Sequence, residues 1–359
     1  MMELNKIYLG DNIETLKTFP DESIDCCITS PPYYGLRDYG TGTWVGGDPE
    51  CPHRRMNKYS ESTSTGHAQE ELRGNVGDAI YKTVCPLCGA VREDKQVGLE
   101  ETTEDYVERL VNIFREVKRV LKPEGTLWVN IGDSYMSTTS TNRNFIGEGG
   151  RGGNNAFIKK NITNSNLKVK DLIGVPWMLA FALRNDGWYL RQDIVWEKTS
   201  PMPESVKDRC TKSHEYIFLL SKQAKYYFNN KAIQEPCEYP NAKGAKFGGN
   251  KYGIDQEGFE IYSGEEYTAN GYRNKRDVWR VTPAHYSEAH FATYPEELVQ
   301  PMVAAGCPKG GVVLDPFMGS GTTAVVAKRN GCNYVGCELN PDYIEMANRR
   351  IATVPYRLF

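Results

Sequence analysis

The stretch "VVLDPFMGSGTT" at residues 312–323 constrains the fold more than any other part of the chain. An apolar, β-branched run ends at Asp315, glycines follow at 319 and 321, and a helical pattern begins directly after them. Glycine lets a backbone approach a ligand closely, and a helix that begins there offers free amide donors. The pattern therefore predicts a strand, a tight turn and a helix, with a ligand at the turn.

The acidic residues of this unit narrow the ligand class. The next apolar run, "NYVGCEL", ends at Glu338, and a carboxylate in that position suits two ribose hydroxyls. A phosphate-binding P-loop is excluded, because no Gly-Lys-Ser/Thr follows the glycines. A carboxylate at Asp315 repels a pyrophosphate but attracts a positively charged ligand such as a sulfonium. The glycine spacing alone also fits nicotinamide enzymes or a turn without a ligand.

Along the whole chain, short apolar runs alternate with helical patterns. The runs at 6–11 and 23–30 read as buried strands, and residues 102–121 carry apolar side chains three and four apart, as in an amphipathic helix. This alternation predicts an α/β fold with a mainly parallel sheet and helices on both faces. Segments 214–222 and 225–229 resemble a closing hairpin. Ligands of such sheets bind at strand carboxyl ends where the strand order reverses, so the turns at 29–35 and 315–323 are the candidate sites.

The first of these turns, "TSPPYYGLR" at 29–37, is a rigid corner. Proline fixes φ and removes a backbone donor, so two prolines after a buried strand end that strand. Alone, the corner is explained equally well by a strand-terminating turn with surface tyrosines.

Together, the two turns resemble the amino-group DNA methyltransferases that use S-adenosylmethionine. "DPFMGSGTT" is similar to their cofactor motif and "TSPPY" to their catalytic motif, and the catalytic motif comes first, as in the circularly permuted β class. The segments "GDN" at 10–12 and "HFATYPEELVQPMV" at 290–303 extend the resemblance over nearly the full length. The resemblance implies a Rossmann-like methyltransferase fold with insertions.

It also implies a set of site residues. The methionine part of S-adenosylmethionine would contact the glycine turn, Glu338 would bind the ribose, Asp11 would lie near the adenine, and Phe291 and Pro295 would shape the pocket rim. The expected cofactor-binding residues are Asp11, Phe291, Pro295, Asp315, Phe317, Gly319, Ser320, Gly321, Thr322 and Glu338. For Asp11 and Phe291, a helix cap and a core aromatic are equally good interpretations.

The catalytic residues implied are Ser30, Pro31, Pro32 and Tyr33. An exocyclic amine on a base is a poor nucleophile, and acceptors on its N–H groups make it more reactive. Ser30 Oγ and the Pro31 carbonyl supply such acceptors, and the prolines hold them in place. Tyr33 would stack on a base flipped out of the duplex. Serine in the first position favours the N4 amine of cytosine over the N6 amine of adenine, by analogy with the family.

Other functions stay open at this point. The same corner serves methyltransferases of RNA or of protein amides. A nicotinamide oxidoreductase and a non-enzymatic, zinc-bearing DNA-binding protein are the alternatives of other classes.

Residues 40–100 lose periodicity and contain "CPH" at 51–53 and "CPLC" at 85–88. Three thiols and an imidazole in two pairs suit a closed, structural zinc site formed by Cys51, His53, Cys85 and Cys88. His67 is a competing fourth ligand, and a loop with unpaired cysteines is the alternative. Disulfides are not expected in a reducing compartment.

Charge gives no global indication of nucleic acid, since the net charge is −3. Double-stranded DNA, the partner implied by the resemblance, would instead meet basic loops. Expected phosphate contacts are Lys159, Lys160, Lys168 and Lys170, and expected base contacts are Lys243, Lys246, Asn250, Lys251 and Arg273. His214 is interpreted as a structural residue.

These observations divide the chain into a catalytic domain of 1–40, 101–234 and 277–359, a Cys/His insertion of 41–100 and a target-recognition region of 235–276. We expect a cytoplasmic protein, because the N-terminus lacks the pattern of a signal peptide and the longest apolar run, 175–183, is too short for a membrane span. A cognate restriction endonuclease is a possible partner, and the sequence does not indicate an oligomeric state.

Overall fold

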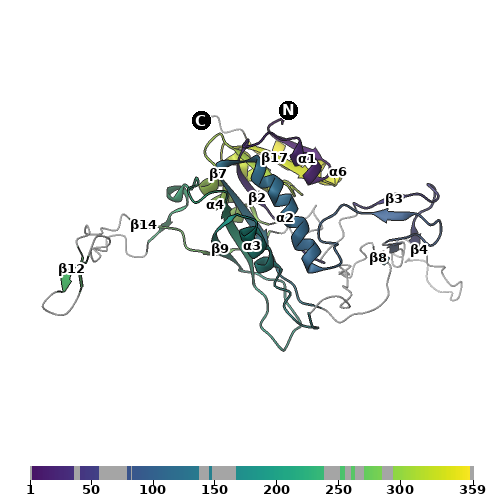
Figure 1. Cartoon of the computed structure of the whole chain (residues 1–359), viewed down its shortest axis with the longest axis horizontal. Coiled ribbons are helices and arrows are strands. Elements are labelled where there is room, and N and C mark those ends of the chain that lie inside the picture. Colours follow the sequence, from purple (N-terminus) through teal and green to yellow (C-terminus); the bar gives the residue numbers. More distant parts are fainter. Residues whose placement is uncertain are drawn as a thin grey trace, which may run out of the picture.

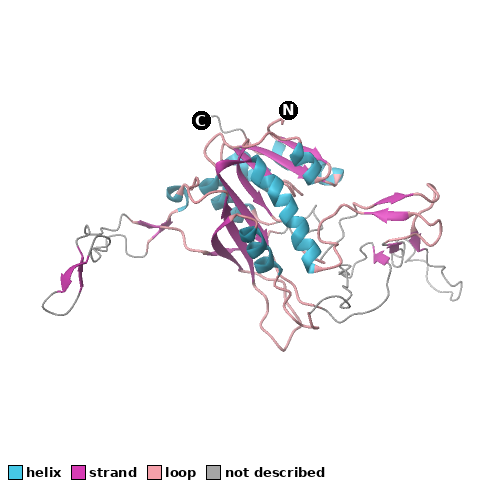
Figure 2. Cartoon of the chain, viewed as in Figure 1, coloured by secondary structure: helices cyan, strands magenta, loops and turns pink. Residues whose placement is uncertain are grey.

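The computed structural model describes residues 2–35, 41–55, 79–81, 83–136, 145–147, 167–237, 251–254, 260–262, 271–284 and 294–355. One eight-stranded sheet forms the centre of this part of the chain, and helices cover both of its faces (Figure 2). This confirms the predicted α/β class.

The strands of the central sheet come from both ends of the sequence. Their order in the sheet is β1-β17-β16-β2-β7-β10-β9-β15. All neighbouring pairs are parallel except those of β10, which runs antiparallel to β7 and to β9. Their bounds are β1 Lys6–Leu9, β2 Ile24–Thr29, β7 Leu121–Ile131, β9 Tyr189–Lys198, β10 His214–Ser221, β15 Val278–Val281, β16 Val312–Asp315 and β17 Asn333–Glu338.

In the described part of the chain, six α-helices pack on this sheet, three on each face. Apolar side chains of α1, α2 and α3 belong to one buried cluster, and those of α4, α5 and α6 to the other. The central strands are buried on both faces, so successive residues supply the two clusters in turn: Cys26 and Ile28 pack on one face and Cys27 on the other. The helices span α1 Asn12–Lys17, α2 Thr103–Val120, α3 Val175–Asn185, α4 Glu296–Gly306, α5 Thr322–Arg329 and α6 Pro341–Ala352.

The strand order reverses between β2 and β16. The chain runs from β2 through α2 to β7 on one side, and from β16 through α5 to β17 on the other. The crevice outside the carboxyl ends of β2 and β16 is therefore the expected ligand site of such a sheet. The prolines after β2 and the glycines after β16 meet there, although almost 300 residues separate them along the chain. Along the chain, the strand that leads into the proline corner precedes the strand that leads into the glycine turn, which is the order expected for the circularly permuted class.

Smaller elements extend from the sheet in two opposite directions (Figure 1). The Cys/His insertion forms a ribbon of β3 and β6, while β4, β5 and β8 form a three-stranded sheet. On the other side lie the pairs β11/β14 and β12/β13. The bounds are β3 Thr43–Val45, β4 Arg54–Arg55, β5 Ala79–Tyr81, β6 Val91–Glu93, β8 Phe145–Gly147, β11 Glu235–Pro236, β12 Lys251–Ile254, β13 Glu260–Tyr262 and β14 Tyr272–Arg273, with a 3₁₀ helix at Asn230–Ile233.

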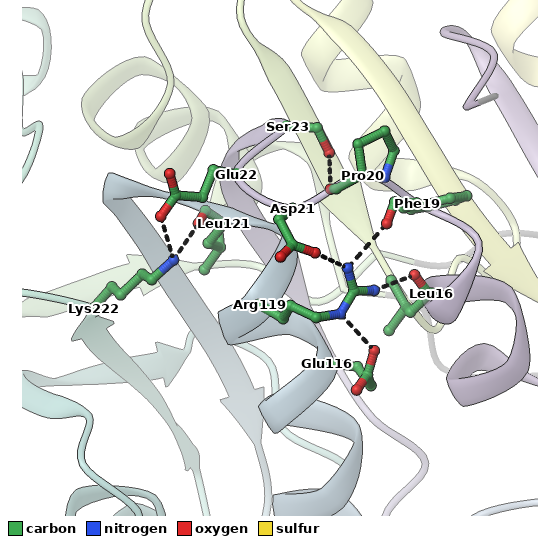
Figure 3. A network of polar contacts seen from close by, with 10 residues as sticks. All are labelled: Leu16, Phe19, Pro20, Asp21, Glu22, Ser23, Glu116, Arg119, Leu121 and Lys222. Atoms are coloured by element: carbon green, nitrogen blue, oxygen red, sulfur yellow. Dashed lines mark hydrogen bonds and ion pairs between the residues drawn. The ribbon is translucent and has the colours of Figure 1, made fainter.

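At the amino ends of β2 and β7, a polar network joins α1 to α2 (Figure 3). The Arg119 guanidinium donates to the backbone carbonyls of Leu16 and Phe19, over 2.7 and 3.0 Å. These carbonyls lie at the carboxyl end of α1, where a helix leaves backbone acceptors without intrahelical partners. Lys222 donates to the carbonyl of Leu121 over 2.8 Å. The acidic partners in this network are Asp21, Glu22 and Glu116.

Two sequence-based expectations concern the strand at 214–222 and membrane-spanning helices. The hairpin of 214–222 with 225–229 was wrong: β10 pairs instead with β7 and β9, and no strand is assigned to 225–229. Among the described residues, no helix combines the length and apolar character that crossing a membrane requires.

Candidate active site

A cavity of about 350 Å³ opens at the carboxyl edge of the sheet, between the two predicted turns. Residues of the proline corner and of the glycine turn line it together. The residues of the predicted site that line this cavity are Ser30, Pro31, Pro32, Tyr33, Phe317, Gly319, Ser320, Thr322 and Glu338. The sheet topology thus brings the two motifs into one pocket.

Glu338, at the end of β17, closes one side of the cavity. Its Oε2 accepts from the Gly319 amide over 2.8 Å, and its Oε1 accepts from the Asn340 amide over 2.9 Å. Each carboxylate oxygen retains acceptor capacity, because an ionised carboxylate has about four lone-pair sites. Burial raises the pKa of this carboxyl group, and the two backbone amides oppose that rise.

The glycine turn depends on the absence of side chains at two positions. Gly321 precedes α5 with a φ of 81°, and a Cβ there would lie 2.7 Å from the Ala347 Cβ. Gly336 in β17 faces Met318, and a Cβ there would lie 2.3 Å from the Met318 Cε. Glycine at these positions lets α6 approach the turn closely and lets the turn approach β17 closely.

Asp315, which the resemblance places among the cofactor residues, is not among the described residues that line the cavity. It is fully buried behind the cavity wall. Its Oδ1 accepts from Thr29 Oγ1 over 2.6 Å and from the Phe317 amide over 3.0 Å, and Thr323 Oγ1 donates to Oδ2 over 2.7 Å. Burial raises the pKa of the Asp315 carboxyl. Asp315 therefore joins the ends of β2 and β16 and shapes the turn from behind.

Other predicted residues lie around the cavity or outside the described part. Asp11 caps α1 by accepting from the Glu14 amide over 3.1 Å, and Pro295 precedes α4. Neither these two nor Gly321 and Asp315 are among the described residues that line the cavity. Phe291 lies outside the described residues. Tyr294, three positions further along the sequence, lines the cavity, and its hydroxyl donates to Asp315 Oδ2 over 3.1 Å.

The proline corner is held from outside the cavity. The Tyr106 hydroxyl of α2 donates to the Pro32 carbonyl over 2.8 Å. The Gly35 amide donates to the Gly98 carbonyl over 2.9 Å, and a Cβ on Gly98 would lie 3.0 Å from the Tyr33 carbonyl oxygen. These contacts fix the backbone of the corner independently of any ligand.

A polar network beside the corner was missed by the sequence interpretation. The Tyr33 hydroxyl lies 2.6 Å from Glu215 Oε2 and 3.3 Å from Asn130 Oδ1. Asn130 Nδ2 donates to Glu215 Oε2 over 3.2 Å, and Lys198 pairs with the other Glu215 oxygen. All four side chains line the cavity. Burial and the Glu215 carboxylate raise the pKa of the Tyr33 hydroxyl well above its usual value, so it remains protonated.

The expected metal ligands lie together. The ligand atoms of Cys51, His53, Cys85 and Cys88 all fall within 4.8 Å of one another. His67, the competing ligand, lies outside the described residues.

The DNA-contacting residues remain predictions. Lys168 and Lys170 form ion pairs with Asp171 and Asp208, and Arg273 pairs with Glu235. His214 packs edge-on against Tyr216 with ring centroids 5.3 Å apart, in agreement with a structural role. For Lys251 only the backbone is described. Lys159, Lys160, Lys243, Lys246 and Asn250 lie outside the described residues.

Comparison with known proteins agrees with this arrangement. Residues 24–349 match the model of the N6/N4 DNA methylase family. The chain is therefore a member of the S-adenosylmethionine-dependent DNA amino-methyltransferases, and it is an enzyme that methylates DNA.

Two type II methyltransferases are similar to it over almost their whole length. M.Cfr9I from Citrobacter freundii is 39% identical over 352 residues, which is 98% of this chain and 89% of the relative. M.SmaI from Serratia marcescens is 39% identical over 346 residues, which is 96% and 90% respectively. Among solved structures, the cytosine-N4-specific PvuII DNA methyltransferase superposes with a TM-score of 0.57 at 16% identity, covering 100% of this chain and 89% of that one, which supports the fold.

Proposed function

We propose that this enzyme methylates the N4 amine of cytosine in duplex DNA, with S-adenosylmethionine as the methyl donor. One observation carries the proposal: Ser30 of the catalytic corner and Glu338 of the cofactor turn line the same cavity. A methyl donor and an acceptor amine bound there would lie side by side, and such positioning accounts for much of the catalysis of a group transfer.

The cofactor end of the cavity has the chemistry that S-adenosylmethionine needs. Glu338 retains acceptor capacity for two ribose hydroxyls, and its negative charge favours a cationic ligand. Phe317, Gly319, Ser320 and Thr322 line the part that we assign to the methionine moiety. When bound, the cofactor supplies an electrophilic methyl group, and the residues of this end only bind and orient it.

At the other end, Ser30 Oγ and the Pro31 carbonyl are the proposed acceptors for the two amine N–H groups. A serine hydroxyl has two acceptor lone pairs, and a second donor that holds its proton away from the amine leaves a lone pair facing the amine. The Tyr33 hydroxyl donates its own proton to Glu215, so its oxygen can accept the Ser30 proton. A hydrogen bond from Ser30 lowers the pKa of Tyr33, which opposes the effects of burial and of Glu215. We propose that the Glu215–Tyr33 pair orients Ser30, while the Tyr33 ring face contacts the flipped base.

Lys198 completes this end. It pairs with Glu215 and lines the cavity, so its ammonium group can donate to a ring nitrogen or carbonyl of the target base. Cytosine presents N3 beside the reacting amine and O2 beyond N3 on the same edge. Cytosine is preferred because Ser30 occupies the first position of the corner, and adenine N6 is the alternative target.

Two observations support DNA binding: the family to which the chain belongs, and the positions of the Cys/His insertion and the 235–276 region. The described strands of the Cys/His insertion (β3 and β6) and those of the 235–276 region (β11 to β14) lie on opposite sides of the sheet (Figure 1). We propose that the latter reads the target sequence and that a duplex binds over the cavity between them. The similar enzymes are called type II methyltransferases, so a restriction endonuclease with the same recognition sequence is the proposed functional counterpart, acting on unmethylated DNA.

Nucleoside analysis tests the target base. Duplex DNA is incubated with the enzyme and methyl-labelled S-adenosylmethionine, digested to nucleosides and separated. We expect label in N4-methylcytosine. Label only in N6-methyladenine would replace cytosine by adenine as the target, and no label in any nucleoside of the DNA would overturn the proposed substrate.

A further inference from the structure

The Cys/His insertion brings three thiols and one imidazole to a single point outside the cavity. Cys51 and His53 lie before β4, and Cys85 and Cys88 flank a tight turn before β6. Cys85 is fully buried, and the other three side chains are partly buried. Nothing in the methyl-transfer chemistry uses these groups.

From this geometry we infer that Cys51, His53, Cys85 and Cys88 form a structural zinc site. The Cys51 and Cys85 sulfurs are 3.7 Å apart, and Cys88 Sγ lies 3.5 Å from His53 Nδ1. A tetrahedral zinc ion with bonds of about 2.3 Å to sulfur and about 2.0 Å to nitrogen gives edges of about 3.8 and about 3.5 Å. A disulfide would need about 2.05 Å between the sulfurs.

The surrounding chain is built for this close approach. Gly47 has a φ of 69°, and a Cβ there would lie 2.8 Å from Cys88 Sγ. The Trp44 ring stacks on the His53 ring, with centroids 4.4 Å apart and an interplanar angle of 17°. The Gly89 amide donates to the Cys85 carbonyl over 2.8 Å and closes the turn between the two cysteines.

Among the residues that the structure describes, apolar packing around the cluster is small. Its buried members are Cys85 and Ala90, and Trp44, Cys51 and Cys88 pack partly against them. So little buried apolar surface cannot offset the entropy of ordering the segment. A metal ion that binds the folded segment supplies the missing free energy. Protein side chains provide all four ligands, so the site is structural.

The ribbon of β3 and β6 connects this site to the catalytic cavity. Thr41, just before β3, and Lys95, Gln96 and Val97, just after β6, line the cavity. Asp94 fixes the two ends of the ribbon together, because its Oδ1 accepts from Thr41 Oγ1 over 2.8 Å and from the Gln96 amide over 2.9 Å. We therefore assign the zinc ion a second effect: it holds the ribbon that forms one wall of the cavity.

Metal analysis of the full-length protein tests the site without reference to activity. The protein is purified under reducing conditions without chelators, and its metal content is measured by mass spectrometry. We expect about one zinc per chain in the wild type. Loss of zinc is expected in the Cys88→Ser variant, and full retention in Cys210→Ser, an exposed cysteine outside the cluster. A wild-type protein without zinc, with another metal in its place, or with a Cys51–Cys85 disulfide overturns the inference.

The effect on the cavity wall, which rests on the proposed cofactor site, has a separate readout. We expect S-adenosylmethionine to bind Cys88→Ser about three- to tenfold more weakly than Cys210→Ser, with an unchanged circular dichroism spectrum of the catalytic domain. Equal affinities in a zinc-free Cys88→Ser protein overturn the coupling. If wild-type protein contains zinc but does not bind S-adenosylmethionine, the zinc site stands and the proposed cofactor site fails.

Discussion

At the carboxyl edge of the sheet, Glu338 accepts two backbone amides and keeps lone pairs that face a cavity. At the amino edge, the charged groups of Arg119 and Lys222 are directed instead at backbone carbonyls that end α1 and begin β7 (Figure 3). Similar chemistry therefore serves binding at one edge and closure of the fold at the other. The two edges differ in the partners of these charged groups. At the amino edge the chain itself supplies the partners, whereas at the carboxyl edge Glu338 keeps acceptor capacity for a ligand.

The largest expected difference between the edges is in kcat, and it concerns the two serines that flank β2. Ser30 follows β2 and lines the cavity, whereas Ser23 precedes β2 and donates to the Pro20 carbonyl over 2.7 Å. Ser30→Ala is expected to lower kcat by about 10²–10³-fold, because a preorganised polar group is lost at the reacting amine. Ser23→Ala is the matched control and should keep wild-type kcat. Steady-state methylation of duplex DNA measures both, and wild-type kcat in Ser30→Ala would contradict the catalytic assignment.

Two glycines of the cofactor turn separate steric clash from backbone strain. Gly321→Ala places a Cβ 2.7 Å from the Ala347 Cβ at a φ of 81°, whereas Gly319→Ala, at a φ of 51°, meets its nearest atom at 3.9 Å. We expect the first to lower the free energy of unfolding by about 2–4 kcal/mol and the second by about 1–2 kcal/mol. Urea denaturation of the free protein measures both. Equal losses would show that the close packing of α6 on the turn contributes nothing.

Glu338→Gln tests the open acceptor at the carboxyl edge. We expect affinity for S-adenosylmethionine to fall about tenfold, since an acceptor with a full charge becomes a neutral amide. Glu345→Gln on α6 is the control, because that side chain is 75% exposed and pairs with Arg349.

The pH dependence of binding has a definite sign. Burial raises the pKa of Glu338 above its ordinary value of 4.5. The ribose hydroxyls that we propose as its ligands would donate to the ionised form. Affinity is therefore complete above the raised pKa and weakens as the pH falls through it. In the free protein the sign is opposite: this carboxyl favours folding at low pH, and that contribution is lost as the pH rises from 4.5 through the raised pKa. Isothermal titration from pH 5 to 8 should show a flatter profile for Glu338→Gln, and the same slope in both proteins would contradict the assignment.

The smallest expected effect lies at the amino edge. Arg119→Ala removes donors to two backbone carbonyls and should lower the free energy of unfolding by about 1 kcal/mol, after allowance for solvent screening. The kcat should not change. Arg115→Ala, which loses the ion pair with Asp186, should cost less stability because that side chain is more exposed. Thermal and urea denaturation compare the two, and a large loss of kcat in Arg119→Ala would remove the distinction between the edges.

The parts of the fold that could be predicted follow from local patterns. Buried β-branched runs, the helical spacing of 102–121 and the two turns each depend on neighbours in the sequence. Ser30 and Glu338 line the same cavity. This could be expected from one general rule, that ligands bind where the strand order of a parallel sheet reverses.

The missed network depends on strand order, which local patterns do not encode. Glu215 is the second residue of β10, while Asn130 and Lys198 lie near the carboxyl ends of β7 and β9. They meet because β10 is antiparallel and lies between the other two strands. Polar residues that interrupt or end apolar runs, as in "WVNIGD" and "VWEK", were the available signal.

The surroundings of Asp315 follow from burial and could not be predicted from the motif. The motif shows a carboxylate beside a cofactor turn, but only packing shows that Thr29, Thr323 and the Phe317 amide already surround it. Similarly, the cap formed by Asp11 agrees with the simpler of its two interpretations.

Hydrogen–deuterium exchange on ligand binding tests the distinction between the two edges most directly. Exchange is followed by mass spectrometry with and without S-adenosylmethionine and a cytosine-containing duplex. We predict added protection at 29–35, 315–323 and 336–340, and no change at 16–23 and 115–122. Protection of the amino edge, with none at the carboxyl edge, would contradict the account.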